Sequence, residues 1–157
     1  MADRPEPRKM RVLGSRRVTP SMLRMTLGGA DIVDFPAGQQ GSYVKLMLPS
    51  EDGAPKPVVR TYTIRQQRES ELDIDFALHG NGRTGIATKW ALEAGIGEEI
   101  VLGGPGPAKP LPSGFDHYSI AGDMTALPAI SVNLEALPQH ATGCGDRSAK
   151  RRRSSGS

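Results

Sequence analysis

Two stretches of this chain carry residue types that could hold an anionic, aromatic ligand. The first is RTYTIR, residues 60–65, in which two arginines bracket a tyrosine and two threonines. Side chains alternate along an extended strand, so Arg60 and Tyr62 share one side while Thr61 and Thr63 face the other. Tyrosine can stack on a flat ring, and arginine can hold a diphosphate through paired hydrogen bonds. The same residues would equally suit a surface pair between neighbouring strands.

The second stretch is HGNGRTGIATKWALEAG, residues 79–95, which predicts a short helix that begins near Gly85 and ends before Gly95. Thr84 or Thr88 can supply a hydroxyl, and Gly82 and Gly85 leave the first N–H groups accessible. Such a helix start favours a phosphate, because its N–H groups are unpaired and the helix dipole attracts negative charge. The alternative is a capped amphipathic helix that only covers one end of a β-structure.

A third group of polar residues lies between these two stretches, on the predicted strand ELDIDFALHG, residues 71–80. Asp73, Asp75 and His79 fall on one face of that strand, opposite Leu72 and Ile74. They could bind a metal ion, but alternate residues of a strand lie about 7 Å apart and do not converge on one point. We therefore predict no metal site and interpret this face as the solvent side of the strand. His79, at the end of the strand, is the more interesting position.

The composition indicates which elements must position these residues. A chain of 157 residues with 37% hydrophobic residues can bury one good core, and 19 glycines, 13 prolines and 4% aromatic residues favour short β-elements joined by tight turns. The six predicted strands before residue 103 favour a small antiparallel barrel. They span residues 10–13, 22–27, 42–48, 58–65, 72–79 and 100–102.

The pattern changes after a Gly/Pro-rich linker, residues 103–114. Residues 118–121 predict a short apolar strand, and residues 125–137 predict a helix, which together form the first βα unit of an α/β domain. No second strand is predicted after Leu137, so this domain looks incomplete. We expect that another chain completes it or that the chain is truncated or frameshifted.

The positive charge belongs to the C-terminal tail. The net charge is +3, but residues 144–157 contain five basic residues and one acidic residue, a net of +4, which leaves −1 for residues 1–143. The run KRRRSSGS, residues 150–157, could contact nucleic acid or acidic lipid, but its Ser/Gly-rich end without apolar residues favours disorder. The single cysteine, Cys144, lies in this tail and excludes an internal disulfide. With no signal peptide or membrane-length apolar run, we expect a soluble cytoplasmic protein without nucleic-acid or membrane partners.

Four motifs in this order, RTYTIR, ELDIDFALHG followed by GIATKWA, LGGPGP and AGDMTALPAI, resemble the siderophore-interacting protein family. These are FAD-dependent ferric-siderophore reductases of the ferredoxin-reductase superfamily, and the resemblance covers about residues 10–143. It implies an N-terminal extension over residues 1–9, an FAD-binding six-stranded barrel over 10–104 and a linker over 105–116. Residues 117–143 would be the first βα unit of an incomplete NAD(P)H-binding domain, and 144–157 a basic tail.

The resemblance also implies an activity: hydride passes from NAD(P)H to the flavin, and single electrons then reduce ferric iron held by a siderophore. It implies that Tyr62 packs on the isoalloxazine, Arg60 meets the diphosphate and Thr63 forms a hydrogen bond near the ring or the ribityl chain. His79 and Gly80 would lie against the cofactor, and Gly85, Ala87 and Thr88 would form the phosphate-binding helix start. No residue acts as a catalytic acid or base, because the flavin carries the redox chemistry.

Two positions depart from the family pattern. Ile86 replaces the usual proline at the first helical position, and Met124 replaces a usual acidic residue on the nicotinamide side. Two alternatives stay open: a flavin-binding module without reductase activity, and a small β-barrel adaptor that uses its basic tail.

Overall fold

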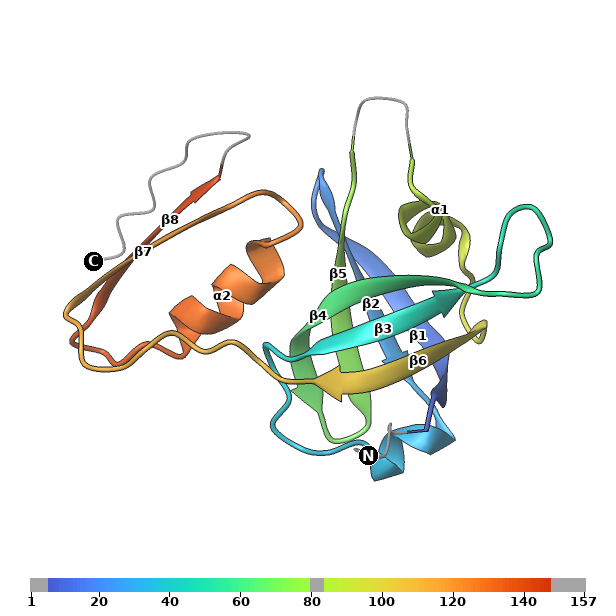
Figure 1. Cartoon of the computed structure of the whole chain (residues 1–157), viewed down its shortest axis with the longest axis horizontal. Coiled ribbons are helices and arrows are strands. Elements are labelled where there is room, and N and C mark those ends of the chain that lie inside the picture. The colour runs from blue at the N-terminus through green and yellow to red at the C-terminus, as the bar shows by residue number, and fades with distance from the viewer. Residues whose placement is uncertain (1–5, 80–83, 148–157) are drawn as a thin grey trace.

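The computed structural model describes residues 6–79 and 84–147, which form a β-barrel followed by a smaller α/β module (Figure 1). The elements are β1 (Arg8–Thr19), β2 (Met22–Gly28), the 3₁₀ helix η1 (Ala30–Asp34), β3 (Tyr43–Leu48), β4 (Val58–Arg68), β5 (Glu71–Ala77), α1 (Ile86–Glu93), β6 (Glu99–Gly106), β7 (His117–Gly122), α2 (Leu127–Glu135) and β8 (Thr142–Arg147). The mainly β fold that the sequence predicts is confirmed.

Strands β1 to β6 close into a barrel in the order β1-β2-β5-β4-β3-β6, and each neighbouring pair is antiparallel. Closure gives each strand a partner on both sides, except along the part of β4 before Ile64, and it follows from the alternating pattern of the strands. On β5, for example, Leu72, Ile74 and Phe76 point inward and are fully buried. Because β5 runs between β2 and β4, its other face lies on the outside of the barrel.

One hydrophobic cluster fills the barrel, with its buried members lying between Met10 and Leu102. Helix α1 covers one end of it, because Ala87 and Ala91 are buried in the same cluster and Trp90 packs against it. The helix contacts β2, β3 and β5, and these contacts hold its first turn close to the end of the barrel.

The second module consists of β7, α2 and β8, in which β7 and β8 pair in parallel from His117↔Thr142 to Gly122↔Arg147. Its first strand and helix match the predicted βα unit. The prediction that no strand follows Leu137 is wrong, because β8 follows. Its sequence, TGCGDR, lacks the apolar alternation by which strands are recognised, so pairing with β7 was not visible from pattern alone.

Two predicted boundaries also differ from the structure. Strand β1 begins at Arg8, inside the predicted N-terminal extension, and continues to Thr19. Strand β6 continues to Gly106, through the GGPG sequence that was predicted to begin the linker. Glycine and proline weaken strand propensity, but β3 pairs with β6 as far as Gly106, beyond Leu102 where the pairing with β1 ends, and this tertiary pairing overrides the local preference.

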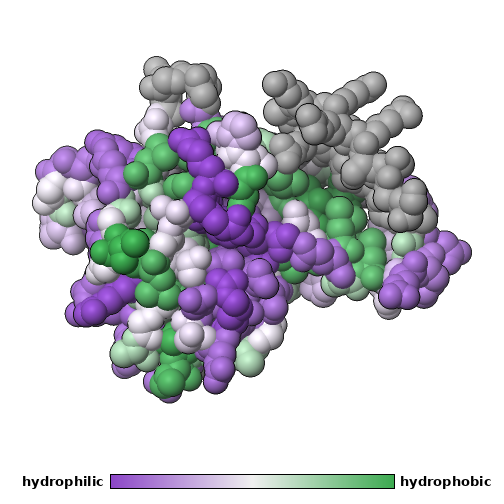
Figure 2. All heavy atoms as spheres, turned by 180° about the vertical axis from the view of Figure 1, so that it is seen from behind, coloured by the Kyte–Doolittle hydropathy of each residue, from purple (hydrophilic) through white to green (hydrophobic). Residues whose placement is uncertain are grey.

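The rear surface is a mosaic of hydrophilic and hydrophobic residues, with hydrophobic side chains most continuous over the second module at the right of the view (Figure 2). Among the described residues, no helix combines the length and apolar character needed to cross a membrane.

Candidate functional site

The site is created where β4 separates from β5. The register of these two strands runs from Arg68 only as far as Ile64, so the part of β4 before Ile64 pairs with β3 alone. Ile64 exchanges backbone hydrogen bonds with Ser42 and Gly41 on the β3 side, at 2.8 and 2.9 Å. Backbone groups alternate along an antiparallel strand, so those of Thr61 and Thr63 point to the other side, toward the gap. The chain thus offers free strand-edge donors and acceptors at this point.

A pocket of about 190 Å³ lies in this gap. Its walls come from β4, the end of β5, the first turn of α1 and the start of α2. The lining residues are Arg60, Thr61, Tyr62, Thr63, Asp75, Ala77, His79, Thr88, Thr125 and Pro128. Five of the eight cofactor-binding residues predicted from the sequence, Arg60, Tyr62, Thr63, His79 and Thr88, therefore share one pocket.

Tyr62 supplies the aromatic surface of the pocket. Its ring packs on Phe76 with a centroid separation of 4.5 Å, and Phe76 in turn contacts Trp90 of α1 at 6.3 Å. This row of rings fixes the tyrosine from below while its upper surface lines the pocket. Burial raises the pKa of Tyr62 and the charge of Arg60 partly opposes it, so the hydroxyl stays protonated around neutral pH.

Arg60 supplies positive charge at the mouth of the pocket. The residue is exposed, and the hydrogen bond recorded for its guanidinium within the described chain is to the adjacent Val59 carbonyl at 3.0 Å. Its remaining donors are available to an anion. The other arginines nearby differ in this respect, because Arg24, Arg65 and Arg68 are each paired with a carboxylate.

The start of α1 has the features of an anion site. Gly85 is the N-cap residue, and no side chain of the described residues caps the helix, although α1 does cover one end of the barrel, as the sequence alternative supposes. Thr88 donates instead to the Ala77 carbonyl, at a long 3.4 Å. Ala87 points into the barrel core, 5% exposed, so only its backbone could meet a ligand. Gly80 and Gly82 lie outside the described residues.

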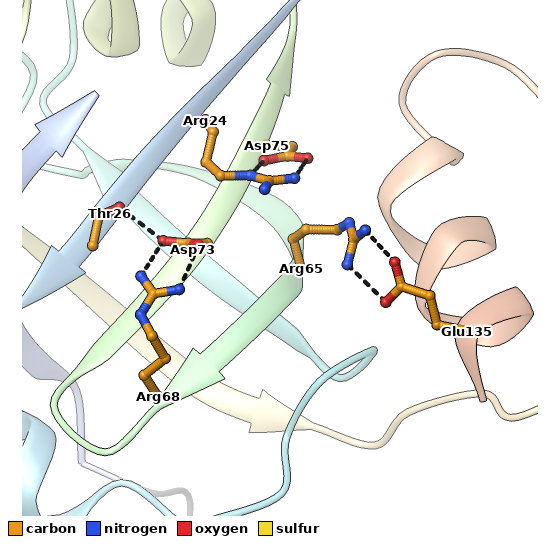
Figure 3. A network of polar contacts seen from close by, with 7 residues as sticks. All are labelled: Arg24, Thr26, Arg65, Arg68, Asp73, Asp75 and Glu135. Carbon is orange, nitrogen blue, oxygen red and sulfur yellow. Dashed lines mark hydrogen bonds and ion pairs between the residues drawn. The ribbon is translucent and has the colours of Figure 1, made fainter. Parts of the chain in front are cut away.

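The outer face of β5 is not solvated, contrary to the sequence interpretation. Asp73 and Asp75 are 4% and 7% exposed, because arginines from β2 and β4 cover them. Arg24 holds both oxygens of Asp75 at 2.7 and 2.9 Å, and Arg68 holds both oxygens of Asp73 at 2.8 Å (Figure 3). These carboxylates are committed to ion pairs, and residues 6–79 and 84–147 contain no cluster of His, Cys, Asp or Glu that could hold a metal ion.

Thr125 and Pro128, from the second module, form the wall opposite His79. Asp123 organises this wall: its Oδ1 accepts hydrogen bonds from the Thr125 hydroxyl and amide and from the Ala126 amide, at 2.5, 2.9 and 3.1 Å. These bonds lower the pKa of Asp123, and the charge of His79 contributes to the same direction. The histidine of the barrel and the acidic turn of the second module thus interact electrostatically.

Sequence reasoning missed part of the lining: Thr61, Asp75, Ala77, Thr125 and Pro128. The alternation of side chains along a strand predicts that Thr61 points away from Tyr62 and the ligand. Both faces of β4 nevertheless border the gap, because β5 has separated from this part of β4. Thr125 and Pro128 belong to the AGDMTALPAI motif, which had been assigned to nicotinamide. Only the packing of α2 on the barrel shows that they also face the predicted flavin residues.

Comparison with known proteins indicates the family of this chain. The chain matches the family described as siderophore-interacting FAD-binding domain over residues 11–56 and 50–109. It is 40% identical to the ferric vibriobactin reductase ViuB of Vibrio cholerae, over 90% of this chain and 58% of that protein. The crystal structure of the siderophore-interacting protein SipS from Aeromonas hydrophila is 39% identical, with a TM-score of 0.75, over 88% of this chain and 57% of that one.

A siderophore utilization protein from T. fusca is 31% identical, with a TM-score of 0.76, over 95% of this chain and 65% of that one. The chain therefore spans less than two thirds of each of these relatives. The family match extends over more than half of the chain and lies on the barrel that carries the pocket. The chain belongs to the siderophore-interacting FAD-binding domain family.

Proposed function

We propose that the pocket between β4, β5 and α1 is the FAD site, with the Tyr62 ring against the isoalloxazine and Arg60 at the diphosphate. The observation that carries this proposal is the convergence of a supported aromatic ring, an available guanidinium and a free strand edge at one pocket. Thr63 lies at the strand edge, and His79 closes the far side. The residues present fit a flat, anionic cofactor.

The start of α1 extends the same site. Gly85, Ala87 and Thr88 would present backbone N–H groups to a phosphate, and the absence of a side-chain cap in the described structure leaves these groups available. Gly80, which the family resemblance also implies, belongs to the same proposal. The chain's own residues thus bind and orient the cofactor and need not move protons.

We infer that the activity is NAD(P)H-dependent reduction of a ferric siderophore, as the reductase in Vibrio cholerae is named for one such substrate. The bound FAD would supply the chemistry, accepting hydride and passing electrons singly to iron. A cytoplasmic setting belongs to this proposal, because the chain has one cysteine and hence no internal disulfide.

One observation favours an alternative, a flavin-binding module without reductase activity. In the described part of the second module, two parallel strands carry one helix, whereas parallel sheets are usually covered by helices on both faces. Mixing the flavin-loaded protein with NADPH and a ferric chelate distinguishes the reductase from the module without reductase activity. Rapid bleaching of the flavin followed by reoxidation would support the reductase, and an unchanged spectrum would support the module.

The FAD site itself is tested by titrating the full chain with FAD and following its visible spectrum. We expect the pair Arg60→Ala with Thr88→Ala to weaken binding about tenfold or more, since charge-assisted bonds to phosphate are the stronger hydrogen bonds. Arg16→Ala, which removes an exposed arginine elsewhere on the barrel, is the control and should bind like the wild type. Wild-type protein that does not bind FAD, or a double variant that binds equally well, would refute the assignment.

A further inference from the structure

Arg65, the second arginine of RTYTIR, has no part in the proposed cofactor contacts, yet the backbone gives it a special position. Ile64 pairs with Ile74 and Gln66 with Asp73, so Arg65 is the extra residue of a β-bulge between β4 and β5. A bulge redirects the side chain of its extra residue, and bulges are frequent beside functional sites. Here the bulge lies where β4 begins to leave β5, two residues after Thr63, the last residue of β4 that lines the pocket.

The bulge directs Arg65 toward α2 rather than toward the barrel's own carboxylates. Its two terminal nitrogens donate to the two oxygens of Glu135, at 2.5 and 3.1 Å (Figure 3). The neighbouring Asp73 and Asp75 are already held by Arg68 and Arg24. Arg65 is 18% exposed at its side chain while Glu135 is 61% exposed, so the arginine is fixed and the glutamate reaches in from the helix.

A second contact lies beside this ion pair on the same face of α2. Val132 and Glu135 are three residues apart, which places them on one side of the helix. A Cβ built on Gly41 would lie 3.1 Å from Val132 Cγ1, so glycine allows the helix to approach closely here. Gly41 also has a φ of +84° and donates to the Ile64 carbonyl, which connects this contact to the bulge.

These two contacts determine where the first turn of α2 lies. Pro128 is four residues before Val132, on the same face, and it lines the pocket together with Thr125. From Pro128 to Glu135 the helix rises about 10 Å, at 1.5 Å per residue. From Tyr62 to Arg65 the strand advances about the same distance. The helix therefore lies along β4 with Glu135 at Arg65 and Pro128 near Tyr62.

We propose that the Arg65–Glu135 ion pair positions α2 along β4 so that Thr125 and Pro128 form the outer wall of the flavin pocket. Arg65 is then a positioning residue of the site, acting through α2 and not by contact with the cofactor. The cofactor part of this inference rests on the proposed FAD site, whereas the placement of α2 does not. Loss of the pair should loosen the second module and open one wall of the pocket.

The experiment measures two independent quantities on Arg65→Gln, on Glu135→Gln and on the exchanged pair Arg65→Glu with Glu135→Arg. Hydrogen exchange of residues 127–135 in the flavin-free full chain reports the docking of α2. The dissociation constant for FAD, with the shape of its visible absorption band, reports the pocket. Glu99→Gln serves as the matched control: it removes a carboxylate that is 53% exposed, against 61% for Glu135, from the Arg11–Glu99 ion pair on the β1–β6 side of the barrel.

Because an exposed pair contributes modestly, each single variant should speed exchange in α2 and weaken FAD binding by about two- to fivefold. The exchanged pair should recover most of both effects, and Glu99→Gln should change neither. A merely structural role of Arg65 in the barrel would not be rescued by a change on α2.

Unchanged exchange in the single variants, or failure of the exchanged pair to restore it, would overturn the placement of α2. Faster exchange with unaltered FAD affinity and spectrum would overturn the role of α2 as a pocket wall. If the wild type does not bind FAD at all, the proposed function fails, and the exchange rates still decide whether Arg65 positions α2.

Discussion

One face of the Tyr62 ring packs against the ring of Phe76, and the residue also lines the pocket. We predict that Tyr62→Phe retains FAD affinity within about twofold and that Tyr62→Ala weakens it about tenfold, as expected for an aromatic contact and the loss of its packing. Because burial keeps the hydroxyl protonated, the affinity of both Tyr and Phe forms should have the same pH profile between about pH 6 and 9. Equal binding by Tyr62→Ala in a spectroscopic titration would exclude ring stacking.

The Asp73 carboxylate should make the free energy of unfolding depend on pH. Burial alone would raise its pKa, but hydrogen bonds from Arg68 and Thr26 outweigh burial and lower it. A lowered pKa means that the ion pair stabilises the fold above the unfolded value, about 3.9, and that this stability is lost as the pH falls through the folded value. Asp73→Asn should therefore cost about 1–3 kcal/mol at pH 7. The difference from wild type should shrink below about pH 4 in urea unfolding, and a constant difference would contradict this assignment.

Individual residues also show why part of the site was predictable from sequence. Arg60, Tyr62 and Thr88 were found because their types suit phosphate and a flat ring, and a short motif keeps them in order. Asp75 was seen but misinterpreted, since its burial depends on Arg24, which lies on another strand and 51 residues away. Long-range pairing of this kind leaves no periodic signal in the sequence.

The end of strand β2 packs closely against its neighbours, and a substitution at Gly28 can test how much this packing stabilises the barrel. A Cβ on Gly28, the last residue of β2, would lie 2.8 Å from the Ser70 carbonyl oxygen and 2.6 Å from Leu13 Cδ1. We expect Gly28→Ala to lower the free energy of unfolding by about 1–3 kcal/mol, because the backbone of the β4–β5 turn must move.

Gly14 on β1 is the matched control, since nothing lies within 4 Å of a Cβ built there and its φ is not positive. Gly14→Ala should remain within about 0.5 kcal/mol of the wild type. If both alanine variants unfold at the same urea concentration, the close approach at Gly28 has no energetic consequence.

Strand assignments from sequence succeeded where one face of a strand is buried. On β2 and β5 the apolar residues alternate because the barrel interior takes every second side chain. Strand β8 was missed because TGCGDR has no such alternation, and the second half of β1 because it contains two arginines and ends at Thr19, directly before Pro20. Strand β8 is determined by its pairing with β7, and the second half of β1 by its pairing with β2, rather than by a local sequence pattern.

The burial pattern over the whole molecule indicates two regions of unequal stability. The continuous hydrophobic cluster lies between Met10 and Leu102, whereas the buried apolar residues in the described part of the second module are Tyr118, Pro128 and Ile130. Regions with few buried apolar contacts open more readily than a closed core. We predict that backbone amides of residues 127–135 exchange at least about tenfold faster than those of residues 72–76, since tenfold corresponds to only 1.4 kcal/mol.

Hydrogen exchange with mass spectrometry on the full chain measures both segments in one experiment. Added FAD should slow exchange on the barrel side, at residues 60–65, because a ligand stabilises the state that binds it. It should also slow exchange in α2, since Thr125 and Pro128 face the same pocket. Equal protection of the two segments without FAD would mean that barrel and second module unfold as one unit. Protection by FAD confined to the barrel would place the cofactor away from α2.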